Sequence, residues 1–142
     1  MIPKRIVLDT NVCLDLFVFR DPRWSTLLAA MEEGFVQACT RDDCRTEWLK
    51  VLDYPHLPLD AHSREAAIAR FDALIVLIAA DRPGTAPLPL CKDPDDQKFL
   101  ELARDIGAAQ LITKDKALLK LARKLARAGM FEILRPDDWQ PD

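Results

Sequence analysis

With 142 residues, the chain can bury about 70% of its unfolded surface, and we expect a single domain over residues 1–142. Its 49% apolar and 30% charged residues are typical of a globular protein, and no apolar run approaches the ~20 residues that a membrane span needs. The net charge of −3 argues against a protein that coats nucleic acid through bulk charge, but not against an enzyme with an acidic site.

The amino-terminal segment and the cysteines indicate an intracellular protein. Residues 1–5 lead into a short strand pattern and lack the apolar stretch of a signal peptide, so we expect a cytoplasmic location. No pair of cysteines has C-x-x-C spacing, and His56 and His62 stand apart from them. We therefore expect buried free thiols rather than a zinc site at Cys13, Cys39, Cys44 and Cys91.

The first predicted elements alternate between strand and helix. A β-branched run from Arg5 to Leu8 predicts a buried strand that ends at Asp9. Asp21-Pro22 then opens a helix, which carries apolar residues at helical spacing and closes at Gly34. Residues 35–39 predict a second strand.

The helix predicted from Arg41 to Asp53 places a carboxylate on its apolar side. Glu47 comes three residues after Cys44 and four before Val51, and both belong to the apolar stripe. A carboxylate in that position is costly without a partner, so Glu47 is a candidate functional residue.

The remaining elements repeat the alternation. A long helix is expected from Ala61 to Ala80, and the proline-rich loop after it allows a short edge strand near Leu88 to Cys91. Asp95 or Asp96 then caps a helix that Gly107 ends. The last predicted elements are a strand at residues 110–113, a basic amphipathic helix at 116–128 and a strand at 131–134.

This alternation predicts an α/β fold, with a parallel sheet covered by helices on both faces. In such sheets the functional crevice lies beyond the carboxyl ends of the strands. Asp9 closes its strand, and Asp115 comes two residues after the strand that ends at Thr113. Asp96 lies at a helix N-terminus, and Glu47 lies in the second turn of its helix. The fold can therefore bring these four carboxylates together.

Four clustered carboxylates predict a metal site. Carboxylates that lie close together disfavour each other's ionisation unless a cation sits among them. Hard oxygen ligands suit Mg²⁺ or Mn²⁺. If Asp9, Glu47, Asp96 and Asp115 converge, the simplest interpretation is a metal-dependent enzyme that acts on phosphates.

Four segments, taken together and in this order, resemble the PIN domain. They are Leu8-Asp9-Thr10-Asn11-Val12, Thr46-Glu47-Trp48-Leu49-Lys50-Val51-Leu52 with Tyr54-Pro55, Asp93-Pro94-Asp95-Asp96-Gln97-Lys98-Phe99, and Ile112-Thr113-Lys114-Asp115-Lys116. They span nearly the whole chain. The resemblance is closest to the small bacterial PIN proteins of toxin–antitoxin systems, similar to VapC toxins.

The resemblance implies a three-layer α/β/α domain with a parallel sheet of four or five strands, and a ribonuclease that depends on Mg²⁺ or Mn²⁺. The catalytic residues and metal ligands would be Asp9, Glu47, Asp96 and Asp115. Asn11 and Thr113 match supporting polar positions, and Asp93 is a further supporting candidate. Because Asp93, Asp95 and Asp96 crowd one segment, any of them could be the ligand there.

The resemblance also implies partners: an RNA substrate, a second copy of the chain, and an antitoxin that offers a basic side chain to the acidic site. For the homodimer, the helices at residues 41–80 would supply the surface. The alternatives are a PIN nuclease that is not a toxin and a catalytically idle PIN scaffold. A phosphohydrolase with Asp9 as nucleophile would need a second aspartate at position 11, where the chain has asparagine.

Each candidate residue also has a purely structural interpretation. Residues 9–11 could form a strand-end turn, Asp96 and Asp115 could cap helices, and Glu47 could be an ordinary surface or ion-paired glutamate. A basic stripe faces away from the apolar side of the last long helix and would ordinarily be a solvated face, with an RNA-backbone contact as the alternative. The stripe consists of Lys116, Lys120, Arg123, Lys124 and Arg127.

Overall fold

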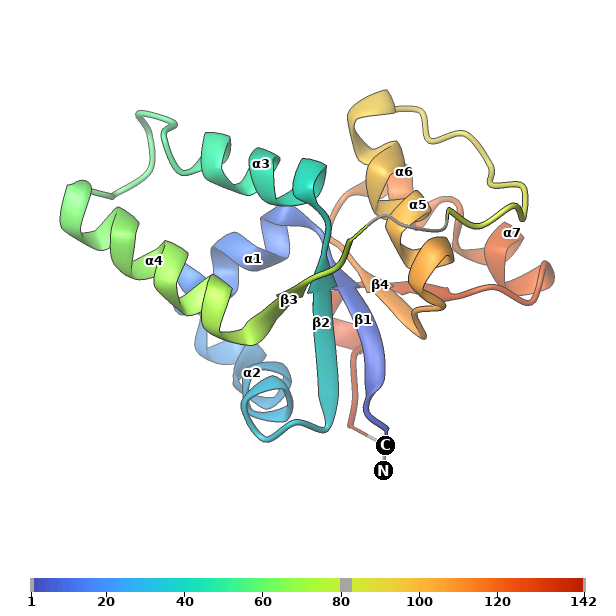
Figure 1. Ribbon diagram of the computed structural model, residues 1–142, viewed down its shortest axis with the longest axis horizontal. Helices are drawn as coiled ribbons and strands as arrows, with labels where there is room; N and C mark the ends of the chain where they lie inside the picture. The colour runs from blue at the N-terminus through green and yellow to red at the C-terminus, as the bar shows by residue number, and fades with distance from the viewer. Residues whose placement is uncertain (1, 80–82, 142) are drawn as a thin grey trace.

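The computed structural model describes residues 2–79 and 83–141, and within them five strands form one all-parallel sheet in the order β3-β2-β1-β4-β5 (Figure 1). The strands are β1 (Lys4–Leu8), β2 (Val36–Thr40), β3 (Ile75–Leu77), β4 (Gln110–Ile112) and β5 (Glu132–Leu134). β1 lies at the centre, where Lys4–Val7 pair with Val36–Cys39 on one side and Ile6–Leu8 pair with Gln110–Ile112 on the other.

Helices cover both faces of the sheet, as Figure 1 shows. Helices α1 to α4 lie on one side of β1, and α5 to α7 lie on the other. Their bounds are α1 (Thr10–Phe17), α2 (Ser25–Glu32), α3 (Asp42–Val51), α4 (Ala61–Leu74), α5 (Gln97–Ile106), α6 (Lys116–Leu119) and α7 (Ala122–Arg127). Short 3₁₀ turns occupy Pro22–Trp24, Pro94–Asp96 and Pro136–Asp138. The predicted three-layer α/β/α architecture is confirmed.

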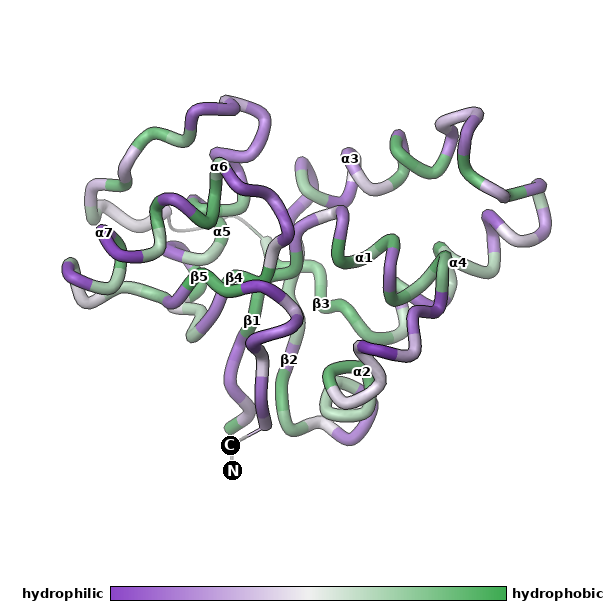
Figure 2. The backbone as a smooth tube through the Cα atoms, turned by 180° about the vertical axis from the view of Figure 1, so that it is seen from behind, coloured by the Kyte–Doolittle hydropathy of each residue, from purple (hydrophilic) through white to green (hydrophobic). Residues whose placement is uncertain are grey.

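Alternation along the central strand builds the two halves of the core. Ile6 and Leu8 join the apolar cluster with α1 to α4, whereas Val7 between them joins the cluster with α5 to α7. Successive side chains of a strand point to opposite faces, so a continuous apolar run is what a strand buried on both faces requires. In Figure 2 the inner strands accordingly carry long hydrophobic stretches.

Four predicted strands agree with the structure to within one residue at each end, but the helix predicted for residues 61–80 is wrong beyond Leu74. α4 ends at Leu74, and Ile75–Leu77 form the edge strand β3 instead of a further helical turn. Pairing with β2 supplies the backbone partners, and the Ile78 N–H donates to the Thr40 carbonyl at 2.9 Å. Tertiary pairing therefore overrides the helical pattern, since β-branched residues suit a strand well. Ala80, the predicted end of the helix, lies outside the described residues.

The edge strand that the loop near Leu88 to Cys91 allowed does not form. The side-chain amide of Gln97 takes the place of a neighbouring strand. Its Oε1 accepts from the Cys91 N–H at 2.7 Å, and its Nε2 donates to the Pro89 carbonyl at 3.1 Å. The backbone groups of this loop are thus satisfied without strand pairing.

The predicted helix at residues 116–128 is divided into α6 and α7 by a tight turn. The Leu121 N–H donates to the Leu118 carbonyl, three residues back, as in a 3₁₀ turn. Lys120 and Leu121 nevertheless keep right-handed helical dihedrals, so the chain direction changes little. The sequence pattern did not predict α1, which begins directly after Asp9.

Two further expectations concern burial. All four cysteines are free and buried, as predicted. Over the described ranges, 2–79 and 83–141, none of the helices combines the length and the apolarity that crossing a bilayer requires.

Candidate functional site

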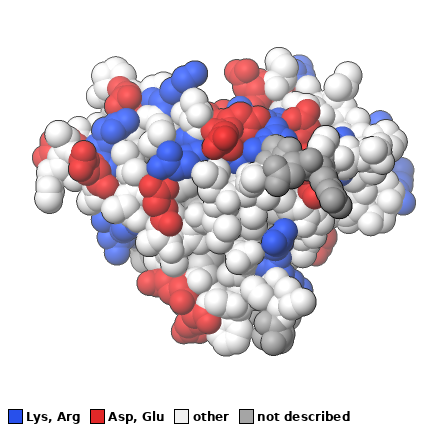
Figure 3. Space-filling view, in the orientation of Figure 1, with Lys and Arg blue, Asp and Glu red and all other residues white. Residues whose placement is uncertain are grey.

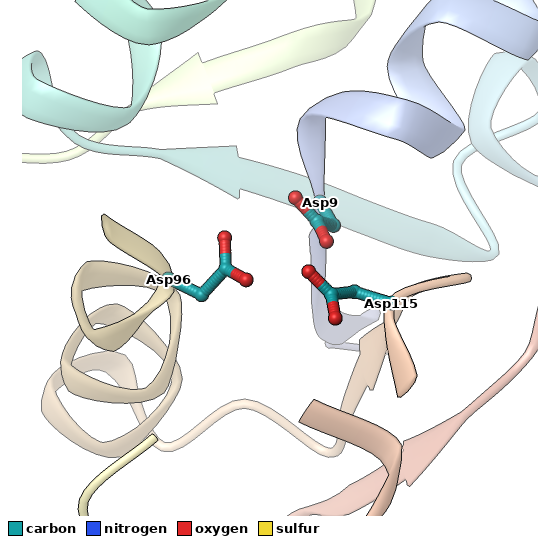
Figure 4. Close-up of side chains that lie close together, drawn as sticks. All are labelled: Asp9, Asp96 and Asp115. Carbon is teal, nitrogen blue, oxygen red and sulfur yellow. The ribbon is translucent and has the colours of Figure 1, made fainter. Parts of the chain in front are cut away.

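Three aspartates lie together beyond the carboxyl ends of β1 and β4 (Figure 4). Asp9 follows β1, Asp115 follows β4, and Asp96 begins α5. One carboxylate oxygen from each lies within 4.8 Å of those of the other two, and the side chains point toward one another. We call Asp9, Asp96 and Asp115 the aspartate trio.

Asp9 is held by three donors although its side chain is almost fully buried. Its Oδ1 accepts from the Thr10 N–H at 2.7 Å. Its Oδ2 accepts from the Thr113 hydroxyl at 2.6 Å and from the Asn11 amide at 3.3 Å. Burial raises the pKa of Asp9 to about 6, and the bonds from Thr113 and Thr10 offset part of that increase.

Asp96 is less well satisfied. Its Oδ2 is buried and has no hydrogen-bond donor among the described residues. It occupies the N-cap position of α5 without making a side-chain capping bond, so capping does not account for it. Burial, a hydrogen bond to Asp115 and the neighbouring carboxylate charges raise the pKa of Asp96 to about 8.

Asp115 has two roles at once. Its Oδ1 accepts from the Ala117 N–H at 2.8 Å and so caps α6, while the same side chain belongs to the trio. The Thr113 hydroxyl accepts from the Asp115 N–H at 2.9 Å and donates to Asp9, which ties the ends of β4 and β1 together. Asn11 adds a second tie, because its Oδ1 accepts from the Lys114 N–H at 3.3 Å. Both predicted supporting residues thus touch the trio or its backbone.

Glu47 lies beside the trio rather than within it. One carboxylate oxygen pairs with the Lys98 ammonium at 2.8 Å, and the other accepts from the Thr10 hydroxyl. Thr10 in turn donates its N–H to Asp9, so Glu47 is connected to the trio through one residue. A role for Glu47 as a metal ligand stays a prediction.

The three aspartates before α5 have different environments. Asp93 and Asp95 are exposed, whereas Asp96 is buried in the trio. The Asp93 Oδ1 accepts from the Asp95 N–H at 3.0 Å and caps the turn that delivers Asp96. Of the three, Asp96 therefore has the geometry of a ligand, and Asp93 a supporting one.

The sequence patterns missed Lys98 and Thr10 as site residues. The Lys98 ammonium bonds both Glu47 and the Asp95 carbonyl, and its side chain is only 18% exposed. One signal was present: Lys98 lies two residues after Asp96, at the start of a helix that leads away from the acidic segment. Its partner Glu47 lies 51 residues away, which no local pattern can indicate.

The donor set fits a divalent cation. The three carboxylates lie close together and repel one another, and the pKa values of two of them are raised. A bound cation would relieve this repulsion. The orphaned Oδ2 of Asp96 also needs either a proton or a cation as its partner. An all-oxygen set favours Mg²⁺ or Mn²⁺ over metals that prefer thiolate or imidazole.

We expect Thr113→Val to weaken Mn²⁺ binding about 10- to 100-fold, as the loss of an outer-shell partner generally does. Valine keeps the shape of this fully buried residue but removes the donor to Asp9, so the pKa of Asp9 rises and a cation must displace a proton. Calorimetric titration with Mn²⁺ at pH 7 measures the change. Thr40→Val is the matched control, because Thr40 is buried at the end of β2 and its hydroxyl donates to the Arg41 carbonyl rather than to the trio. Equal affinities for Thr113→Val and wild type would contradict this role.

Comparison with protein families assigns most of the chain to one family. The profile of a family described as PIN domain, a family of nucleases, matches residues 5–117. A search of curated proteins finds no match to the chain. The matched residues include β1, α3, the start of α5, and β4 through Asp115, so they carry the whole aspartate trio and Glu47. The chain therefore belongs to the PIN domain family.

Proposed function

We propose that the protein is a metal-dependent endoribonuclease that hydrolyses RNA phosphodiester bonds. The observation that carries the proposal is the orphaned Oδ2 of Asp96, buried in a trio of aspartates at the carboxyl edge of the sheet. Family membership supports nuclease chemistry, and the raised pKa values of Asp9 and Asp96 support a site that awaits a cation.

Each residue of such a site would have a separate role. Asp9 and Asp96 would hold the principal ion, and Asp115 completes the set. Bound Mg²⁺ or Mn²⁺ would supply an acidified water and neutralise charge on the phosphate. Thr113 orients Asp9 and keeps one of its oxygens hydrogen-bonded, which limits the rotation of the carboxylate. Asp96 holds a proton near neutral pH until a cation replaces it.

Lys98 and Glu47 form the flank of the site. The ion pair with Lys98 offsets part of the charge of Glu47, and the remainder adds to the repulsion that raises the pKa of Asp9. A strand of RNA that enters the site would meet Lys98 as a nearby cation, and Glu47 could then act on the ion through water.

The cleavage experiment uses single-stranded RNA with Mn²⁺, with EDTA, and with Asp115→Asn. Asparagine also caps helices, so this change removes the charge and keeps the cap of α6. Asp60→Asn is the matched control, because Asp60 caps α4 and takes no part in the trio. Cleavage should need Mn²⁺, survive in Asp60→Asn and fall on the order of 10²-fold or more in Asp115→Asn, with several kcal/mol of charge stabilisation at stake. Cleavage that persists in EDTA would contradict the proposal.

We further propose that the nuclease is the toxin of a toxin–antitoxin pair and acts in the cytoplasm. The resemblance to VapC-like proteins supports this, as does the chemistry of the trio, which suits an antitoxin that inserts arginine among the carboxylates. A homodimer is proposed on the same resemblance. Leu77 on the edge strand β3 is 52% exposed and offers apolar surface to a second copy.

The toxin proposal is tested by expressing the chain alone in bacteria. Wild type should slow growth, Asp96→Asn should relieve the effect, and Asp60→Asn should not. Harmless expression of wild type that is active and metal-replete would leave a PIN nuclease without a toxin role.

A further inference from the structure

The surface of α6 and α7 carries a row of five exposed cations, which we call the basic face: Lys116, Lys120, Arg123, Lys124 and Arg127. On the opposite side of the same segment, Leu118 and Leu125 are buried against the sheet and α5. Because the 3₁₀ turn at Lys120–Leu121 keeps helical dihedrals, the cations stay on one side of the segment. At 1.5 Å per residue, the segment runs about 18 Å.

These five cations stand apart from the ion pairs of the part of the chain that the structure describes. In residues 2–79 and 83–141, none of the five side chains makes an ion pair or a hydrogen bond. Two other cations near the trio are paired instead: Lys98 with Glu47 and Lys114 with Asp15, both at 2.8 Å. The cations near the trio are thus neutralised, whereas those of the basic face are available.

The basic face stands out against the charge of the chain. Residues 116–131 contain these five cations and no Asp or Glu, although the whole chain carries −3, so the rest of it carries −8. At physiological ionic strength charges are screened within about 8 Å, so acids elsewhere on the molecule do not cancel this local field. In Figure 3 basic side chains also show at the right-hand edge, the side on which Figure 1 places α7.

Helix stability explains only part of this pattern. Lys124 and Arg127 lie in the last turn of α7, where a cation favours the helix dipole. Lys116 belongs to α6, which is only about one turn long, so the dipole does not account for its charge. Arg123 lies in the first turn of α7 and likewise gains nothing from the dipole.

The basic face begins where the trio ends. Asp115 caps α6, and the Leu119 N–H donates to the Asp115 carbonyl, so this helix is anchored directly at the site. A polyanion approaching the trio is repelled by its carboxylates, and it needs attraction from outside the trio to stay bound. The basic face is the nearest unpaired source of that attraction along the chain.

We infer that the basic face binds the phosphodiester backbone of single-stranded RNA and holds the strand with one phosphate at the aspartate trio. This inference rests on the proposed nuclease function and adds to it the path of the substrate. Contacts to phosphates alone carry no sequence information, so the basic face would give affinity and not cleavage specificity.

The test replaces three cations that lie outside the trio, in the triple variant Lys120→Gln, Arg123→Gln and Arg127→Gln. Glutamine is a good helix former and keeps a polar side chain without the charge. Binding of a fluorescent single-stranded RNA to the protein in EDTA is measured against salt concentration. Each phosphate contact contributes about 0.7 to the slope of log K against log salt, so the slope should fall by about 2 in magnitude.

The matched control removes three cations elsewhere in Arg5→Gln, Arg23→Gln and Arg64→Gln. Arg5 on β1 and Arg23 at Pro22–Trp24 are exposed, and Arg64 on α4 is half-buried. The control changes net charge equally and should leave the slope within about one contact of wild type. Equal losses in both triple variants would overturn the inference and indicate a bulk charge effect. An unchanged slope in the first variant would also overturn it, provided that thermal melting shows both variants folded.

Cleavage of a small phosphodiester substrate tests the proposed function independently of the basic face. Such a substrate reaches the trio without touching the basic face, so the first triple variant should cleave it with Mn²⁺ as wild type does, while its KM for long RNA rises. If wild type cleaves neither substrate, the nuclease proposal fails. If the variant cleaves long RNA with an unchanged KM, only the basic face is refuted.

Discussion

Asp9→Asn is expected to abolish metal-dependent cleavage while leaving the metal-free protein as stable as wild type or more stable. The loss of activity follows from removing a carboxylate that the other two trio members cannot replace, and it should be on the order of 10³-fold. The stability result follows from the pKa of about 6, some two units above the value of a free aspartate. At pH 7 that ionised, buried carboxylate costs about 3 kcal/mol of folding free energy.

The opposing effect is smaller. Asparagine retains one acceptor oxygen, so the change sacrifices one of the bonds that Asp9 accepts, worth about 1 kcal/mol. The net gain should be about 1–2 kcal/mol in EDTA. Thermal melting in EDTA at pH 7 and cleavage rates with Mn²⁺ measure the two effects.

Asp15→Asn supplies the contrast for this prediction. Asp15 is also a buried aspartate, but it pairs with Lys114 and accepts from the Trp24 indole at 3.2 Å. Its charge has a partner, so its removal should lower the melting temperature. If Asp9→Asn melts well below wild type in EDTA, Asp9 is a structural residue and the interpretation of the trio is wrong.

Metal binding is expected to release a proton near neutral pH, and its affinity should rise steeply with pH. The pKa of Asp9 is about 6 and that of Asp96 is about 8, and both values are higher than in the unfolded chain. When the pKa of an aspartate is higher in the folded protein than in the unfolded one, the group stabilises the fold fully at a pH below the unfolded pKa. This stabilisation is lost as the pH rises through the pKa of the folded protein. The metal-free protein should therefore lose stability from about pH 4 to pH 8.

A bound cation reverses this trend, because it needs both carboxylates ionised. Between pH 6 and 8 one proton must leave Asp96, so the dissociation constant for Mg²⁺ should fall by up to about 10-fold per pH unit. Titration calorimetry in two buffers of different ionisation enthalpy counts the protons released, and about one is expected at pH 7. Asp96→Asn should bind more weakly and release fewer. Binding in wild type with no proton release would contradict the raised pKa of Asp96.

Much of this site could be predicted from the sequence because its residues lie at the ends of strands or at the start of a helix. Asp9 follows a β-branched run and Asp115 comes shortly after a strand, and strands of a parallel sheet deliver their carboxyl ends to one edge. Asp96 could be placed near that edge by the turn chemistry of Asp93-Pro94, although the choice among Asp93, Asp95 and Asp96 needed their burial.

The parts that could not be predicted depend on contacts between distant segments. The sequence pattern of residues 75–77 predicts the last turn of a helix, and only their pairing with β2 makes them a strand. α1 was missed because its apolar run, from Val12 to Phe17, suits a buried strand as well as a helix. The pairing of Glu47 with Lys98 requires the packing of α3 against α5, which no local spacing contains.

The most direct test of this account is a crystal structure of the protein soaked in Mn²⁺, with diffraction data collected near the manganese absorption edge. The account predicts an anomalous peak among the carboxylates of Asp9, Asp96 and Asp115, with the Asp96 Oδ2 as a ligand, and no peak there in Asp9→Asn. Manganese bound elsewhere on the molecule, with the trio left empty, would contradict it.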